Sequence, residues 1–394
     1  MVNGEKCSWC KAGDSECDWS FSDFTQSIFP TSISSLVGGR GFPYYHPSIQ
    51  KPFDSGDNTA PNDAITMAIV VSHGNSRNGR DYCSYMTNAV LNSGGNLSST
   101  LVIATQIYET GDAAIDESTM IWWSKSSSDN GQRNWKWGGN STEELNASIS
   151  SFSVFDEIVL KLAERTSYPN LRRVVFAGHS AGGQVMQRYA LFSMMGPGGA
   201  LSGSLPADLN ISYYIANPSS TTYLSAERPV NVSPADRNCS FCDNSTLTQQ
   251  QWTFAMPKEG DGSAAASCLS TYNSYGYGLE GTLMDYPGGV GIDAALSQYP
   301  LRDVTYMSGE SDVCDTDYQS SHNCTTCTVD DGGLDVSCEG YAQGWCRMAR
   351  LHAFSQHVNG YYEEPVHTLL SVPFVGHSGC GMFQSEEFAA AALS

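Results

Sequence analysis

The sequence predicts an α/β fold with a mostly parallel central sheet and helices on both faces of that sheet. Apolar runs of strand length alternate along the chain with segments of helical period, which is typical of β-α-β units. Such units place their strands parallel, because each helix returns the chain to the same end of the sheet. The 394 residues, of which 40% are hydrophobic, are enough for one large domain or two ordinary ones.

The expected elements follow these two periods. Strands are expected at residues 64–71, 101–107, 174–177, 212–216, 304–307 and 368–372. Helices are expected at residues 82–91, 149–165, 182–191, 341–356 and 386–393, the last with Ser385 as its N-cap. Residues 1–60 are expected to form a loop-rich, cysteine-containing segment packed on a main domain at 61–394. Residues 217–300 lack a clear period and are expected to form a cap-like insertion in that domain.

An excess of acidic residues limits the partners of the chain. The formal net charge is −21, from 41 Asp and Glu against 20 Lys and Arg. Nucleic acids and anionic membrane surfaces are bound by clustered basic residues, so neither is expected as a partner. The chain has no run of eighteen apolar residues, and no transmembrane helix is expected.

Cysteines and glycosylation motifs indicate an extracellular protein. The thirteen cysteines include three C-x-x-C pairs, at 7/10, 239/242 and 324/327. Two such pairs would suffice for a four-thiolate zinc site, and disulfides are the alternative. We favour about six disulfides with one thiol left over, because the chain also carries eight N-x-S/T sequons. The sequons lie at Asn96, Asn140, Asn146, Asn210, Asn231, Asn238, Asn244 and Asn323. We therefore expect a secreted protein with N-glycans, whose leader is not present in this chain, and no metal or other cofactor.

The most informative motif is Gly178-His179-Ser180-Ala181-Gly182, between a predicted strand and a predicted helix. A strand–turn–helix of this kind exposes its serine at the end of a sheet. The turn is so sharp that side chains on the flanking glycine positions would crowd it. Ser180 is therefore the candidate nucleophile. A serine in a purely structural turn is the alternative interpretation.

A second motif, at residues 73–78, directly follows the predicted strand at 64–71. In acyl transfer, negative charge develops on the former carbonyl oxygen, and two backbone N–H groups aimed at that oxygen stabilise it. We expect one donor from Ala181, directly after the nucleophile, and the other from Asn75 or Ser76.

The residues around these donors have expected roles of their own. His73, Gly74 and His179 are expected to contact the substrate. For Arg77, a structural tie to an acidic neighbour is favoured over binding of a substrate carboxylate.

A serine nucleophile requires a base, and the base requires an acid that orients it. Among the eight histidines, His377 has the best setting, between a predicted strand and the last predicted helix. The acid is expected after the strand at 304–307, and Asp312 lies five residues beyond that strand. Its rivals are Glu310, the strongest, and Asp315 and Asp317. A calcium site made by Asp312, Asp315 and Asp317 is less favoured, because the ligand set is incomplete.

Together these motifs resemble the α/β-hydrolase superfamily. The resemblance rests on His73-Gly74-Asn75-x-Arg77-Asn78, Gly178-His179-Ser180-Ala181-Gly182-Gly183, Gly309-x-x-Asp312 and Val375-Gly376-His377-Ser378. More narrowly, the chain is similar to a group of secreted hydrolase-like proteins from microbes and fungi. That likeness rests on Ala216-Asn217-Pro218-Ser219-Ser220, on Tyr272-Asn273 and on the segment from Leu334 to Arg347.

The resemblance covers about residues 64–384 and implies an α/β-hydrolase fold. It also implies a catalytic triad of Ser180, Asp312 and His377. The oxyanion donors that it implies come from Ala181 and from the loop at 73–76.

The predicted function is that of a secreted serine hydrolase that cleaves a small-molecule or polymer-linked carboxylic ester through an acyl-enzyme. Peptidase and lipase activities are less favoured, since no segment has the pattern of a broad apolar lid helix. The alternative class is a catalytically inactive hydrolase fold that serves as a binding or extracellular-matrix protein. That class predicts the loss of a triad member, and none is missing. In the expected cap, packing is favoured over substrate stacking for the aromatic residues Trp252, Tyr272, Tyr275 and Tyr277.

Overall fold

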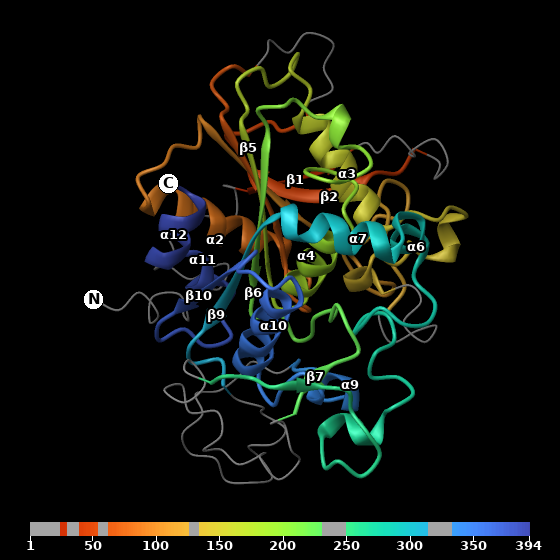
Figure 1. The fold of residues 1–394 in the computed structure, drawn as a ribbon. Coiled ribbons are helices and arrows are strands. Elements are labelled where there is room, and N and C mark those ends of the chain that lie inside the picture. Colours follow the sequence, from red (N-terminus) through yellow and green to blue (C-terminus); the bar gives the residue numbers. More distant parts are fainter. Residues whose placement is uncertain (1–23, 30–38, 54–61, 126–133, 231–249, 314–332) are drawn as a thin grey trace.

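The computed structural model describes residues 24–29, 39–53, 62–125, 134–230, 250–313 and 333–394. At its centre lies an eight-stranded sheet with the order β1-β2-β4-β3-β5-β6-β9-β10 (Figure 1). Its strands are β1 (Phe24–Phe29), β2 (Phe42–Pro47), β3 (Met67–Ser72), β4 (Thr100–Thr105), β5 (Arg173–His179), β6 (Asn210–Ala216), β9 (Asp303–Gly309) and β10 (Thr368–Val372). β2 pairs antiparallel with both β1 and β4, and every other neighbouring pair in this sheet is parallel. The predicted fold class, an α/β fold with a mostly parallel sheet, is confirmed.

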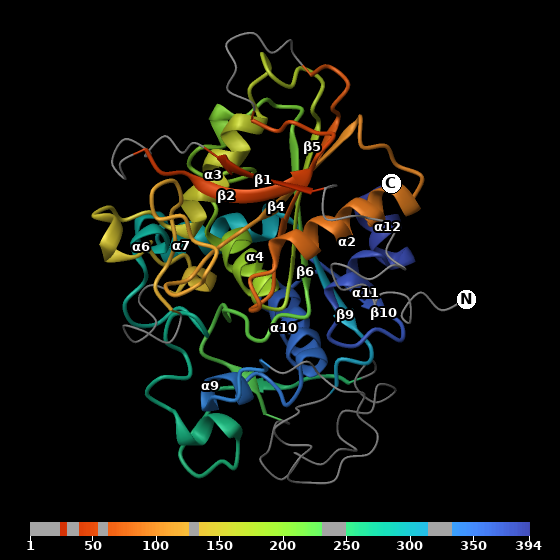
Figure 2. The ribbon, with the colours of Figure 1, turned by 180° about the vertical axis from the view of Figure 1, so that it is seen from behind.

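Helices cover both faces of the sheet, as the two opposite views show (Figures 1 and 2). One face carries α3 (Ser151–Leu162), α4 (Ala181–Phe192), α6 (Asp285–Val290), α7 (Ile292–Gln298) and α10 (Arg347–Tyr361). The other face carries α2 (Gly79–Asn92), α11 (Gly379–Phe383) and α12 (Glu386–Ala392). Away from the sheet lie α9 (Cys338–Tyr341) and a two-residue pairing of β7 (Arg228–Pro229) with β8 (Phe254–Ala255).

The side chains of the central strands alternate between two cores. In β5, Val174 and Phe176 join the apolar cluster under α3, α4 and α10. Val175 and Ala177 join the cluster under α2, α11 and α12. Because both faces of β5 are buried, the strand has a continuous apolar sequence instead of an alternating one.

Six of the eight strands of this sheet fall where the sequence predicts strands, namely β3, β4, β5, β6, β9 and β10. The last predicted helix is also confirmed as α12. The side chain of Ser385 accepts a hydrogen bond from the Phe388 N–H, as expected of an N-cap.

The description of residues 1–60 as loop-rich is wrong for two segments, because β1 and β2 extend the sheet at one end. Pro43 and Pro47 in β2 lack an N–H and are typical of loops or edge strands. Consistently, β2 pairs with β4 over only two positions, Tyr44 with Thr105 and Tyr45 with Ala104. Such a short pairing needs no alternating apolar pattern, so the sequence carries little signal for it. The division into an N-terminal segment, a main domain and a cap at 217–300 stays a prediction.

The single helix expected at 341–356 is two helices. α9 ends at Tyr341, and α10 begins at Arg347. Between them Gly344 has φ +145°, which favours glycine, and a Cβ there would come within 3.0 Å of the Arg350 backbone nitrogen. The helical period of the sequence continues through a turn that the backbone makes at this glycine.

The described residues include one disulfide, and the expected number of about six stays a prediction. Cys268 and Cys338 form a disulfide, whereas Cys83, Cys346 and Cys380 are buried thiols. The other eight cysteines lie outside the described residues. The three C-x-x-C pairs lie outside the described residues. Within the described ranges, no helix combines the length and the apolar character needed to cross a bilayer.

Candidate active site

The ends of three parallel strands bring the predicted triad residues together. Ser180 directly follows β5, Asp312 follows β9, and His377 follows β10. Parallel strands that run in the same direction end at one edge of the sheet, which is where α/β proteins assemble their sites. His377 Nε2 lies 3.0 Å from Ser180 Oγ, and His377 Nδ1 lies 2.8 Å from Asp312 Oδ2.

The turn at Ser180 explains the glycines that flank it. Ser180 has φ +59°, a conformation that side chains other than glycine rarely adopt. A Cβ on Gly178 would lie 2.2 Å from the Gly182 carbonyl oxygen, and one on Gly182 would lie 2.3 Å from the Ser72 carbonyl oxygen. The backbone N–H of Ser180 donates to the carbonyl of Ala216, 3.0 Å away on β6. Packing on both sides therefore holds the serine in its strained conformation.

The acid that contacts His377 is Asp312 and not its rival Glu310. Asp312 Oδ2 accepts from the Nδ1–H of His377, so the unprotonated Nε2 is left to accept from the Ser180 hydroxyl. The other predicted rivals, Asp315 and Asp317, lie outside the described residues. The calcium alternative, which needs both of them, therefore stays untested.

Two residues that sequence reasoning missed contact the predicted acid and the loops that carry the predicted acid and base. The Nη1 of Arg347 lies 3.5 Å from Asp312 Oδ1, with both side chains 0% exposed. Burial raises the pKa of Asp312, and the nearby Arg347 works against that rise. Asn217 Oδ1 accepts from the Gly309 N–H and its Nδ2 donates to the Gly376 carbonyl, so one amide links the acid loop to the base loop. Both Arg347 and Asn217 lie in segments on which the family resemblance rested. That resemblance was the sequence signal that could have identified them.

The loop after β3 approaches the nucleophile closely. A Cβ on Gly74 would lie 3.5 Å from Ser180 Cβ and 3.1 Å from the Tyr82 hydroxyl oxygen, so only glycine fits here without displacement. Asn75, one of the two predicted donors on this loop, comes next along the chain. Ala181, the other expected donor, is the first residue of α4, where backbone N–H groups have no acceptor within the helix.

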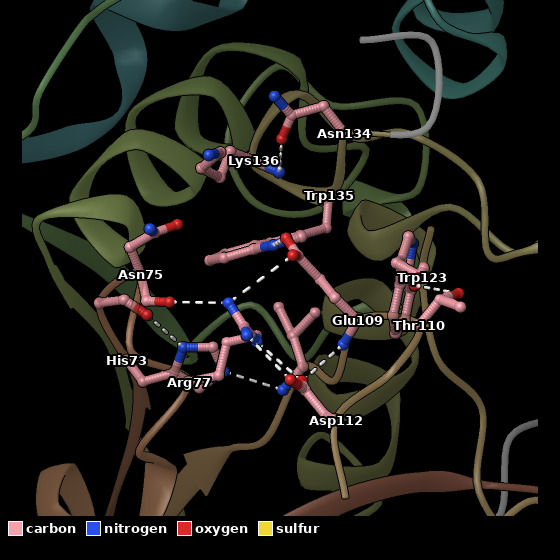
Figure 3. A network of polar contacts seen from close by, with 12 residues as sticks. His73, Asn75, Arg77, Glu109, Thr110, Asp112, Trp123, Asn134, Trp135 and Lys136 are labelled. Carbon is pink, nitrogen blue, oxygen red and sulfur yellow. Dashed lines mark hydrogen bonds and ion pairs between the residues drawn. The ribbon is translucent and has the colours of Figure 1, made fainter. Parts of the chain in front are cut away.

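Arg77 anchors this loop, and its predicted structural role is confirmed (Figure 3). Its Nε and Nη2 donate to the two carboxylate oxygens of Asp112, at 2.7 and 2.8 Å. Its Nη1 donates to the carbonyl of Asn75 at 2.9 Å, and the amide of Gln106 donates to the carbonyl of Arg77. Asp112 also accepts from the Glu109 N–H. The guanidinium is thus used in tying residues 75–77 to the segment that follows β4.

The imidazoles of His73 and His179 are buried and make contacts within the protein, and their expected contact with the substrate stays a prediction. His73 Nδ1 donates to the Gly74 carbonyl, and its Nε2 accepts from the Ile107 N–H, so both ring nitrogens are engaged. Burial lowers the pKa of His73 to about 4, and the ring is neutral at neutral pH. His179 Nδ1 contacts the Tyr82 hydroxyl at 2.9 Å, and its ring packs 4.5 Å from that of His377. Sequence reasoning missed that both rings are buried: His73 contacts the backbone of the loop after β3, and His179 packs against His377.

Aromatic residues of the expected cap pack within the protein, as favoured. Tyr272 and Tyr275 are buried, and the Tyr275 hydroxyl donates to the carbonyl of Trp137 at 2.6 Å. The Tyr277 hydroxyl donates to Asp335, and its ring meets Trp137 edge to face. Trp252 is buried in a small cluster with Trp345 and Met348.

No family model matches the sequence, and no curated protein matches it. Among solved structures, the chain is similar to LpqC, a poly(3-hydroxybutyrate) depolymerase from Bordetella parapertussis, with 16% identity over 92% of this chain and 87% of that chain and a TM-score of 0.47. Poly(aspartic acid) hydrolase-1 from Sphingomonas sp. KT-1 has 16% identity over 92% and 96%, also with a TM-score of 0.47. Carboxyl esterase 2 from Tuber melanosporum has 13% identity over 94% and 81%, with a TM-score of 0.38. At these levels the matches carry no information on activity. The sheet, its helices and the turn at Ser180 are those of an α/β-hydrolase fold.

Proposed function

We propose that this chain is a serine hydrolase that cleaves carboxylic esters, with Ser180 as nucleophile, His377 as base and Asp312 as orienting acid. The observation that supports it best is the continuous relay of 2.8 and 3.0 Å contacts from Asp312 through His377 to Ser180. These three side chains follow three different strands of the sheet. The relay has the distances and order that acyl transfer by a serine requires.

The proposed reaction runs in two halves. Ser180 Oγ attacks the ester carbonyl carbon while its proton passes to His377 Nε2, and the carbonyl oxygen becomes an oxyanion. The N–H groups of Ala181 and of Asn75 or Ser76 are the proposed donors to that oxyanion. When the tetrahedral intermediate collapses, the bond to the alcohol oxygen breaks and His377 returns the proton to that oxygen. Water then attacks the acyl-enzyme in the same way and releases the carboxylic acid.

Asp312 serves both halves of the reaction. It accepts the Nδ1–H of His377, which selects the tautomer with a free Nε2. Its negative charge also stabilises the imidazolium that forms each time Nε2 takes up a proton.

The proposed setting is extracellular, and the substrate is a small-molecule or polymer-linked ester. Eight sequons and the Cys268–Cys338 disulfide support secretion with N-glycosylation. The second candidate, an inactive binding or matrix protein, has no specific observation in its favour because the triad geometry is complete.

The decisive experiment combines a fluorophosphonate probe with an ester panel. We expect wild-type protein to be labelled once, at Ser180 by peptide mass mapping, and to hydrolyse p-nitrophenyl acetate, butyrate or octanoate. Ser180→Ala should lose labelling and reduce kcat by about 10⁶-fold while keeping the same circular dichroism spectrum. Equal labelling of the folded variant, or no labelling of the folded wild type, would refute the proposal.

A further inference from the structure

We propose that Arg347 is a positioning residue for the reaction, whose guanidinium keeps Asp312 ionised and aimed at His377. This inference deepens the proposed function and rests on it for the meaning of the site. The ion pair itself can be tested without any turnover.

The two oxygens of Asp312 have divided partners. Oδ2 accepts from His377 Nδ1 at 2.8 Å, and Oδ1 lies 3.5 Å from Arg347 Nη1. Neither carboxylate nor guanidinium has any solvent exposure. Arg347 is the first residue of α10, and the N–H of the next residue, Met348, donates to the backbone carbonyl of Asp312 at 3.2 Å. The start of this helix therefore holds both the charge and the main chain of the acid.

A carboxylate in this position needs a nearby positive charge. Moving an ionised carboxyl group out of water is unfavourable, and an uncompensated buried acid takes up a proton instead. A protonated Asp312 would be neutral and could donate its own O–H to Nδ1 of His377 instead of only accepting from it. The tautomer with a free Nε2 would then no longer be selected, and the imidazolium would lose its stabilising negative charge.

Within the described part of the chain, the titratable and charged groups that face Asp312 come from three elements. They are His377 from the base loop, His179 from β5, and Arg347 and Arg350 from α10. Burial holds the pKa of His179 well below its usual value, so that ring is neutral. The Arg350 guanidinium donates to the carbonyls of Gly344, Ser219 and Asp335. Among these described groups, Arg347 is therefore the cation at ion-pair distance from Asp312.

The separation of 3.5 Å is at the outer limit for a hydrogen bond, so Arg347 acts on Asp312 mainly through its charge. Removing that charge makes protonation of the Asp312–His377 pair easier, whichever of the two groups takes the proton. The pKa of the pair must rise. The inactive protonated form then persists to higher pH, and the acid limb of the kcat/KM profile moves upward. A lysine at the same position keeps the charge and should keep the profile.

We would follow the His377 ring by NMR of 13C-histidine-labelled protein between pH 4.5 and 9, assigned with His377→Asn. Arg347→Met should raise the titration midpoint by about 1–3 pH units, and Arg347→Lys should leave it within about half a unit. Arg302→Met is the matched control, because Arg302 is equally buried and donates to the Met195 and Ser193 carbonyls. It should not move the midpoint.

Each outcome separates the two proposals. An unchanged midpoint in Arg347→Met overturns the role of Arg347, whether or not the protein hydrolyses esters. If Arg347→Met raises the midpoint, but wild-type protein hydrolyses no ester and does not react with the fluorophosphonate probe, only the proposed function is refuted. If Arg347→Met does not fold, the double variant with Asp312→Asn should be the more stable of the two at pH 8, because it removes the unpaired buried charge. A double variant that is no more stable than Arg347→Met overturns the inference.

Discussion

Two arginine–aspartate pairs support the candidate site, and they differ in geometry and burial. Arg77 and Asp112 lie behind the loop after β3, joined by two hydrogen bonds of 2.7 and 2.8 Å with side chains 25% and 20% exposed. Arg347 and Asp312 lie behind the loops that carry the predicted acid and base. Arg347 Nη1 is 3.5 Å from Asp312 Oδ1, and neither side chain is exposed. The residue types are the same, but the first pair forms two short hydrogen bonds and is partly exposed to solvent. The second pair is farther apart and fully buried.

The difference shows that one ion pair can hold a loop in a fixed geometry, while another acts through its charge on a pKa. Water screens the partly exposed pair, so its value lies in the fixed geometry of the bidentate contact. Burial is the largest single influence and acts to raise the pKa of Asp112, but the hydrogen bonds from Arg77 and the Glu109 N–H, together with the charge of Arg77, lower the pKa overall. In the dry pair, burial prevails and raises the pKa of Asp312, although Arg347 opposes it. We therefore propose that the first pair positions the predicted oxyanion loop and that the second controls the protonation of the predicted acid.

The largest expected effect comes from exchanging each aspartate for asparagine. Asp312→Asn should lower kcat by about 10⁴-fold with an intact fold, because an amide favours the wrong tautomer of His377. Asp112→Asn should lower kcat by no more than about 10-fold, since its amide oxygen can still accept from Arg77. Steady-state kinetics on one p-nitrophenyl ester compares the two variants. Equal losses in both would contradict the division of roles between the pairs.

A smaller effect is expected from the arginine of the exposed pair. Arg77→Met should release residues 75–77 and misplace an oxyanion donor, which lowers kcat by about 10–100-fold. The acid limb of the kcat/KM profile should stay in place, unlike that of Arg347→Met. Arg172→Met is the control, because Arg172 is a half-exposed arginine that pairs with Asp208 elsewhere on the protein. A shift of the acid limb in Arg77→Met would mean that this pair also controls protonation.

A third aspartate, buried like Asp312, sharpens the comparison and should have the smallest effect on activity. Asp156 is held by the hydroxyls of Tyr189 and Tyr286 instead of by an arginine. Burial raises its pKa to about 6, although both hydrogen bonds oppose the rise. The folded protein then binds this proton more tightly than the unfolded chain does. The stabilisation is complete below pH 4 and is lost as the pH rises through 6.

The measurement is the free energy of unfolding in urea at several pH values. Between pH 4 and 7, wild-type protein should lose about 1–3 kcal/mol relative to Asp156→Asn, with equal kcat in both. Parallel stability profiles for the two proteins would show that Asp156 titrates normally.

Local sequence patterns sufficed for the central strands and the elbow. The apolar run at 174–177 predicts a strand buried on both faces, and the glycines at 178 and 182 are required by contacts of the turn with its immediate surroundings. The order of Ser180, Asp312 and His377 along the chain was also sufficient to choose the triad candidates. By contrast, β2 contains two prolines and pairs with β4 over two positions, so its identity as a strand depends on the neighbour that it meets.

What the sequence determined by itself is therefore the set of elements with a strong period, the sharp turn at Ser180 and the candidate nucleophile, base and acid. These depend on backbone sterics and on apolar periodicity, which act between residues close in the chain. Only the tertiary structure decided that Arg77 meets Asp112, that Arg347 meets Asp312, and that the rings of His73 and His179 are used internally. Those contacts join residues far apart in the sequence, and no spacing rule links a charged side chain to a partner that only packing brings near.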